Sequence, residues 1–517
     1  MDSILKGLGG VTNAILAGAV VAVLLFLFWD SFQRWLRLNL VLWKVPGPSA
    51  YPIIGNALMF IGGPRDFFRV VRQCRNKYGT IFRLWVGRRG IIFVCGAETV
   101  QPLLSSSVHI NKSLEYKCLE PWLGTGLINS GGTKWHSRRK LLTGAFHTAI
   151  LEGYLESMDK GARKLAAVLL SHAPKDNPDD WTEQINVCQL TKLSALDVIC
   201  ETIMGYHINA LEGKANLDYI MAIDKVNQIL QRRFITPWLL SDFIFYLTPM
   251  AKEFNKGVET IHKFTDRVIK EKREEFAARQ KEGMQNGLTD HPKRKSFLDL
   301  LLDLSDNGKV LSDADIREEV DTFMFAGHDT TSAAMDFSLY SLGHHPEAQE
   351  KILEETQATL EENGKLTLSL INKMEYLDRF IKEVLRLYPS VPQVARELDS
   401  PLTIDGHTFP PGTTINILNS VLHRDPRYFP NPDNFDPDRF LPSEIANRHS
   451  FAYTPFSAGS RNCIGQKLAL MELKLVVIRI VQALEVRSII KEEDLVLQGE
   501  ITLNSPDGVP LLFRKRR

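Results

Sequence analysis

One cysteine near the C-terminus constrains this chain most strongly. Cys463 lies between Gly459 and Gly465 and follows Arg461, and an apolar helical pattern begins directly after it, in the order FSAGSRNCIGQKLALMELKLVVIRIVQAL. A helix N-terminus and a neighbouring cation both favour a thiolate. The two glycines would let a flat, bulky group approach the backbone. A buried structural cysteine is the ordinary alternative, but a thiolate ligand to haem iron meets all these conditions.

Composition excludes several other classes of protein. The chain has 517 residues, 44% of them hydrophobic, with 62 Lys and Arg against 61 Asp and Glu. Disorder, collagen and coiled coil are therefore excluded as the main architecture. A formal net charge of +1 provides no global field that would attract nucleic acid. The 6 cysteines form no CxxC pair, so a disulfide scaffold and a zinc finger are both disfavoured.

The N-terminus carries an uncharged, mostly apolar segment at about residues 7–29. A helix needs about 20 such residues to cross a bilayer, whereas the apolar region of a cleaved signal peptide is usually about 7 to 15 residues long. Interfacial aromatics and the cations Arg34, Arg37 and Lys44 follow the segment, which favours an uncleaved anchor with the body of the protein in the cytosol. We expect a membrane anchor and its flank at 1–44 and a stiff proline hinge at 45–49.

The body, residues 50–517, is expected to be mainly α-helical with small β-sheets, an α+β class. Ser312 and Asp315 form a predicted capping box that opens a helix reaching Gly343. At 1.5 Å per residue, that helix would span about 45 Å. Strand-like alternation is confined to short stretches such as 81–86, 91–95 and 402–418. A body of this length holds either two domains or a core built around something other than protein.

The segment around Cys463 resembles the FxxGxRxCxG haem-binding signature of the cytochrome P450 monooxygenases, and every defining position matches. The resemblance implies one large haem domain of the P450 fold behind the transmembrane helix. It also implies haem b with Cys463 as its iron ligand, and contacts to the haem from Phe456, Gly459 and Arg461.

Further motifs keep the order of that family. Glu383 and Arg386 resemble its ExxR motif and the segment ending at Arg439–Phe440 its PERF-like segment, which implies a buried network of Glu383, Arg386 and Arg439. Taken alone, Glu383 and Arg386 could be an exposed pair on one helical face. Trp135 and Arg139 resemble the WxxxR motif. The resemblance implies that Trp135, Arg139, Arg461 and Arg396 contact the haem propionates.

The long helix carries AGHDTT at 326–331, which is similar to the oxygen-activating segment of the family. Phe323, Ala326, Gly327, Thr330 and Ala334 recur at steps of three and four residues, so we expect one face with room for a diatomic ligand and a substrate. The resemblance implies catalytic roles for Thr330 in oxygen activation and for Asp329 in proton relay. The alternative is plain helix packing, with Thr330 bonded back to a carbonyl one turn earlier.

Several stretches, at 117–127, 135–147, 197–205 and 319–325, resemble family four of the superfamily, which includes many insect enzymes. That branch typically oxidises fatty acids and related lipids at or near the terminal carbon. Many of its members have Glu where this chain has Ala326, and that Glu can form an ester with a haem methyl group. Ala326 has no carboxyl group, so we expect a non-covalent haem.

The electrons must come from a partner, because no GxGxxG segment follows a strand and no flavin or nicotinamide domain is present. The resemblance implies NADPH–cytochrome P450 reductase as partner and an endoplasmic reticulum membrane location, and leaves the assistance of cytochrome b5 open. Lys134, Arg138, Arg139 and Lys140 form either a reductase-docking patch or an ordinary solvated helix face.

Three rival functions stay open beside oxidation of a lipophilic substrate. They are a broad xenobiotic oxidase of the same fold, a fatty-acid peroxide isomerase, and a non-enzymatic haem sensor. Asp329 and Thr330 argue against the isomerase and, with the small residues of the same helix, against the sensor.

Overall fold

The computed structural model describes residues 18, 23, 33, 36, 38–174, 177, 180–213, 217–286, 296–305, 311–363 and 366–517. The predicted anchor at about 7–29 lies outside these residues, apart from Gly18 and Val23. Among the helices that the structure describes, none combines the length and the apolar character needed to cross a bilayer.

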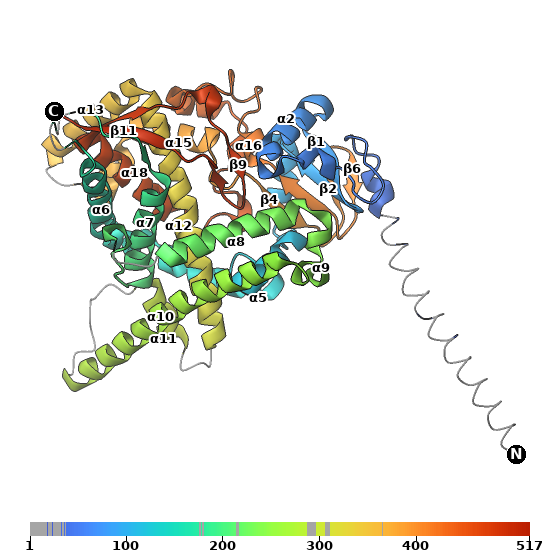
Figure 1. Cartoon of the computed structure of the whole chain (residues 1–517), viewed down its shortest axis with the longest axis horizontal. Helices are drawn as coiled ribbons and strands as arrows, with labels where there is room; N and C mark the ends of the chain where they lie inside the picture. Colours follow the sequence, from blue (N-terminus) through green and yellow to red (C-terminus); the bar gives the residue numbers. More distant parts are fainter. Residues whose placement is uncertain are drawn as a thin grey trace, which may run out of the picture.

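Helix α12, Asp313–His344, runs through the middle of the molecule (Figure 1). The predicted capping box is confirmed, because Ser312 Oγ accepts from the Asp315 N–H at 3.2 Å and the Asp315 carboxylate accepts from the Ser312 N–H at 3.0 Å. The helix ends one residue beyond the expected Gly343. Its buried residues lie on every side, as in a helix enclosed by protein.

Of the helices that the structure describes, six make up most of the packing around α12. Helices α7 (Cys188–Ile199), α10 (Pro249–Asn286), α15 (Glu375–Leu387) and α18 (Gln466–Ala483) pack directly on it, α6 (Thr148–Leu170) packs on α7 and α18, and α8 (Leu217–Ile235) packs on α10. The other helices are α2 (Asp66–Tyr78), α3 (Ala97–Leu104), α4 (Glu120–Leu123), α5 (Gly132–Thr143), α9 (Asp242–Tyr246), α11 (Phe297–Ser305), α13 (Pro346–Asn363), α14 (Leu368–Lys373), α16 (Asn419–Leu422) and α17 (Pro442–Ala446).

Small sheets complete the fold, and the largest lies to one side of the helices (Figure 1). It has the order β1-β2-β7-β4, with β1 (Ile81–Val86), β2 (Arg89–Val94), β7 (Thr414–Ile417) and β4 (Val394–Glu397). Only the β2–β7 pair in this sheet is parallel. The other sheets are β3 (Ile185–Asn186), β11 (Pro510–Lys515) and β8 (Leu484–Ser488); β5 (Leu402–Ile404) and β6 (His407–Phe409); and β9 (Gln498–Gly499) and β10 (Leu503–Asn504). The predicted mainly helical α+β class is confirmed.

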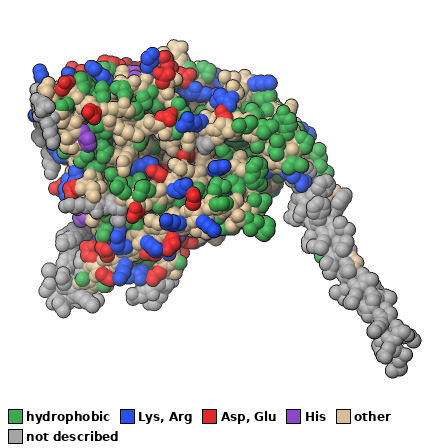
Figure 2. All heavy atoms as spheres, viewed as in Figure 1, with side chains coloured by type: hydrophobic (Ala, Val, Ile, Leu, Met, Phe, Trp, Pro, Cys, Tyr) green, Lys and Arg blue, Asp and Glu red, His purple; other side chains and the backbone are tan. Residues whose placement is uncertain are grey.

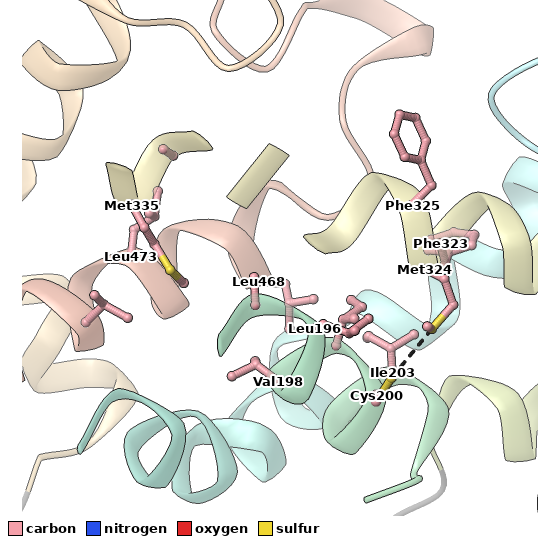
Figure 3. Packing of buried hydrophobic residues seen from close by; sticks show 14 of the residues in the cluster. Leu196, Val198, Cys200, Ile203, Phe323, Met324, Phe325, Met335, Leu468 and Leu473 are labelled. Atoms are coloured by element: carbon pink, nitrogen blue, oxygen red, sulfur yellow. Dashed lines mark hydrogen bonds between the residues drawn. The ribbon is translucent and has the colours of Figure 1, made fainter. Parts of the chain in front are cut away.

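The main apolar core fills the space where α7, α12 and α18 meet. Figure 3 shows Leu196 and Ile203 beside Met324, and Met335 near Leu473. The sulfurs of Cys200 and Met324 are 3.7 Å apart. This core fixes α12 against the start of α18, and therefore against the loop that carries Cys463.

Candidate active site

A largely apolar cavity of about 420 Å³ lies between α12, the loop before α18, α5, α8 and the β4 and β7 strands. Cys463 lies in its wall and is exposed to it. Trp135, Arg139, Phe456 and Arg461 also line it, as does Thr330. The structure therefore brings together side chains that are far apart in the sequence, such as Trp135 and Cys463.

The Cys463 loop is held by its own backbone. The Cys463 N–H donates to the Phe456 carbonyl at 2.9 Å, and the Asn462 N–H donates to the Gly459 carbonyl at 3.2 Å. Gly459 has φ +67°, and a Cβ there would lie 1.9 Å from the Leu104 carbonyl oxygen. The expectation that Gly459 makes room for a flat ligand is therefore wrong, because this glycine packs the loop against the end of α3. A Cβ on Gly465 would meet only the Cys463 sulfur, at 4.0 Å. The space that we expected beside Gly465 for a flat group is therefore present.

The electrostatics around Cys463 differ from the sequence expectation. Burial raises the pKa of the Cys463 thiol, while the Gly465 N–H and the charge of Arg139 lower it. Arg139, not the neighbouring Arg461, is therefore the cation that acts on this sulfur. Burial outweighs these two effects, so the net shift of the pKa is upward. A coordinated metal ion deprotonates a thiol outright.

Four cations gather near the cavity wall, and we call Lys112, Arg139, Arg396 and Arg461 the cation cluster. Burial lowers the pKa of Lys112, and the charges of Arg396 and Arg461 lower it further. Burial likewise lowers the pKa of Arg461 to about 9, with Arg396 and Arg139 adding to the shift. In the part of the chain that the structure describes, none of the four forms a salt bridge. Buried charges without partners are costly, so the cluster calls for an anionic group.

Neutral partners hold two members of the cluster in place. The Arg461 guanidinium lies 4.4 Å above the Trp135 ring and donates to the Ile110 and Leu127 carbonyls, both at 3.0 Å. Arg139 donates to the Asn462 carbonyl and side-chain oxygens, at 2.8 and 2.7 Å.

The other two members of the cation cluster differ in their position relative to the cavity. Arg396 is buried in β4 and does not itself line the cavity, although its neighbour Ala395 does. Lys112 does line it and was missed by sequence reasoning, because a lone lysine in a loop carries no motif.

The predicted network of Glu383, Arg386 and Arg439 is confirmed. Glu383 and Arg386 are both fully buried, with a two-pronged contact at 2.6 and 2.7 Å. Arg439 Nε lies 3.4 Å from the same carboxylate. Arg386 also donates to the carbonyls of 423, 432 and 434, and Arg439 to those of 430 and 431. The network therefore holds the irregular chain that leads toward the Cys463 loop.

The AGHDTT segment of α12 is split between two environments. Ala326 and Thr330 line the cavity, and the Thr330 hydroxyl donates to the Ala326 carbonyl at 2.7 Å, which is the back-bonded arrangement considered as the alternative. Asp329 is buried outside the cavity lining and accepts from Thr502 Oγ1 at 2.8 Å and from Asn227 Nδ2 at 3.4 Å. Because Thr502 lines the cavity, Asp329 reaches the cavity through that hydroxyl.

Gly327 does not serve the cavity as expected. A Cβ there would lie 2.3 Å from Ile199 Cδ1 on α7. The missing side chain therefore lets α7 and α12 approach closely. Gly327 does not line the cavity, whereas the other members of the predicted face do: Phe323, Ala326, Thr330 and Ala334.

Comparison with known proteins identifies the family. The family model for cytochrome P450 matches residues 45–509. The chain belongs to the cytochrome P450 family. It is 40% identical to cytochrome P450 4c3 of Drosophila melanogaster, over 96% of this chain and 93% of that protein. It is also 40% identical to human cytochrome P450 4V2, over 98% of this chain and 96% of that protein. The crystal structure of the cytochrome P450DA heme domain shares the fold, with a TM-score of 0.75 at 24% identity, covering 92% of this chain and 98% of that one.

Membership makes this protein a haem-thiolate monooxygenase, and its residues fit the haem. A thiol faces the cavity, and the cation cluster beside it lacks anionic partners that the haem carboxylates would supply. When bound, haem supplies the iron at which O2 is activated for insertion of one oxygen atom into a C–H bond.

The expected docking patch of this P450 is mostly engaged in internal contacts. Arg138 is buried and paired with Asp315 of α12, and Lys134 pairs with Glu318 at 2.8 Å. Arg139 faces the Cys463 loop. Lys140 alone among the four predicted cations is exposed. The cationic segment therefore joins α5 to α12 and does not form a continuous patch.

Proposed function

We propose that this P450 oxidises a lipophilic substrate, a fatty acid or related lipid, at or near its terminal carbon. The observation that carries the proposal is the apolar cavity, which opens on Cys463 and the small residue Ala326. Resemblance to the lipid-oxidising branch supports the same substrate class, and the 40% identity to proteins named as cytochromes P450 4c3 and 4V2 agrees with that branch.

In this proposal Cys463 is the iron ligand. Phe456 and Gly459 shape the ligand loop, while Trp135, Arg139, Arg396 and Arg461 bind the haem carboxylates, together with Lys112. Bidentate guanidinium donors suit carboxylates. Because Ala326 has no carboxyl group, the haem is held without a covalent ester.

Asp329 and Thr330 are the proposed proton-handling pair. The buried Asp329 carboxylate accepts the Thr502 hydroxyl at 2.8 Å, and Thr502 faces the cavity. A proton held at Asp329 can therefore reach the cavity through Thr502. The Thr330 hydroxyl, now bonded to the Ala326 carbonyl, can turn toward the cavity and donate its own hydrogen bond there.

We also propose the placement of the protein. Residues 1–44 hold the anchor, with its helix at about 7–29, residues 45–49 form the hinge, and 50–517 form the catalytic domain on the cytosolic side of the endoplasmic reticulum. Exposed apolar side chains on α9 and the preceding turn support this placement: Phe243 is 78% exposed and Trp238 55%. Ile53 and Ile61, near the proposed hinge, are 81% and 79% exposed. Figure 2 shows hydrophobic side chains gathered at that end of the molecule.

Turnover tests the proposal. The full-length holoenzyme is combined with NADPH and NADPH–cytochrome P450 reductase, dodecanoate or 1-dodecanol is added under isotopically labelled O2, and the products are analysed by mass spectrometry. We expect one labelled oxygen at or next to the terminal carbon, and no product from Cys463→Ser. Products without label would contradict a monooxygenase reaction, and oxidation of unrelated drug-like compounds alone would support the xenobiotic alternative.

A further inference from the structure

An acidic side chain faces the cavity from the turn between β9 and β10. Glu500 is 8% exposed and is one of the residues that line the cavity. Its N–H donates to the Thr502 carbonyl at 3.1 Å, and its Oε1 accepts from Gln498 Nε2 at 2.5 Å. Since β10 packs on α12 and Thr502 bonds Asp329, this turn is fixed beside the segment that carries Thr330.

The charges that line the cavity are unevenly distributed. Within the described part of the chain, two carboxyl groups line it, those of Glu115 and Glu500, and Glu115 is paired with Arg89 at 2.7 Å. Glu500 forms no salt bridge with any residue that the structure describes. The cations in the lining are Lys112, Arg139 and Arg461, all of which belong to the cation cluster assigned to the haem carboxylates. Among the residues that the structure describes, Glu500 is therefore the acid of the cavity without an ion-pair partner, whereas the cations of the cavity are assigned to the haem carboxylates.

The surroundings of Glu500 bring its pKa close to neutral pH. Burial raises the pKa of Glu500 to about 7. The charges of Asp329 on α12 and Asp224 on α8 raise this pKa as well, whereas Lys192 on α7 and the hydrogen bond from Gln498 lower it. The side chain can therefore donate a hydrogen bond when protonated and accept one when ionised.

We propose that Glu500 is a specificity-determining residue that hydrogen-bonds a hydroxyl group of an uncharged lipid and disfavours a free carboxylate. This inference rests on the proposed lipid oxidation and narrows its substrate class. A hydroxyl group both donates and accepts, so it pairs with either form of Glu500. A substrate carboxylate can only accept, and the ionised form of Glu500 repels it.

Two ligands of equal length, 1-dodecanol and dodecanoate, test the proposal by their affinity for the full-length holoenzyme. Binding is followed by the change in the haem Soret spectrum at about pH 6 and about pH 8, on either side of the pKa of Glu500; dodecanoate is charged at both. We expect the Kd of dodecanoate to rise about tenfold between the two conditions and that of dodecanol to stay constant. Glu500→Gln keeps the shape, removes the charge and should make the dodecanoate Kd independent of pH.

A matched control is Glu493→Gln. Glu493 is an acid on the surface, with its side chain 77% exposed, and this variant should behave as the wild type. The carbon monoxide spectrum of each variant verifies that haem is bound in a folded protein. A dodecanoate Kd that is independent of pH in the wild type, or equally dependent on pH in Glu500→Gln, would overturn the inference while leaving lipid oxidation intact. If neither ligand binds to a spectroscopically intact protein, the inference fails together with the proposed substrate class.

Discussion

Glu383→Gln should destabilise this P450 strongly, although it only replaces one carboxylate oxygen by an NH2 group. The Glu383 carboxylate accepts from Arg386 Nε at 2.6 Å, from Arg386 Nη2 at 2.7 Å and from the Asp436 N–H at 2.8 Å. In either orientation, the new NH2 group faces a donor. The buried Arg386 also loses its counter-charge, and breaking such a pair costs about 3–5 kcal/mol.

Three carbonyl acceptors still hold the Arg386 guanidinium. We therefore expect the free energy of unfolding to fall by an amount near the lower limit, about 3 kcal/mol. Urea unfolding, followed by tryptophan fluorescence and by the haem Soret band, measures it. Glu259→Gln removes the carboxylate from an exposed pair with Lys263, at 2.7 Å, and should leave the unfolding midpoint unchanged. If both variants unfolded at the same urea concentration, the buried network would not stabilise the fold as argued.

Three further predictions follow from the site. Acid–organic extraction should remove the haem from the wild type because Ala326 cannot form an ester; haem that stays with the protein would refute this. Arg138→Glu should lower thermal stability by breaking the pair with Asp315, whereas Lys140→Glu, at an exposed side chain, should leave it unchanged; equal melting temperatures of the two variants would contradict the assignment. Gly459→Ala should greatly reduce the yield of haem-loaded protein, because the added Cβ would overlap the Leu104 carbonyl oxygen; a normal yield would exclude that clash.

Features with a local cause could be predicted from the sequence. The start of α12 follows from the capping box of Ser312 and Asp315, whose groups are three residues apart. The position of Cys463 before α18 and the pairing of Glu383 with Arg386 likewise depend on neighbours within one or two helical turns. Burial of that pair came from the family resemblance, because spacing alone equally allows an exposed pair.

Features that depend on distant segments could not be predicted. Gly327 is required by Ile199 on α7, and Gly459 by the Leu104 carbonyl. Arg138 is neutralised by an acid on another helix, so a cationic run in the sequence is not a cationic surface. Lys112 joins the cation cluster because the fold brings its loop beside β4 and the Cys463 loop. Each of these residues has a role set by tertiary neighbours that no local pattern specifies.

The central claim is that Cys463 is the thiolate ligand of the haem. The reduced carbon monoxide difference spectrum of the full-length protein and of Cys463→Ser tests it most directly, because a red-shifted Soret band reports thiolate ligation. We expect the band in the wild type and its loss in the variant. A folded, haem-loaded wild type without the band, or a variant that retains it, would contradict the claim.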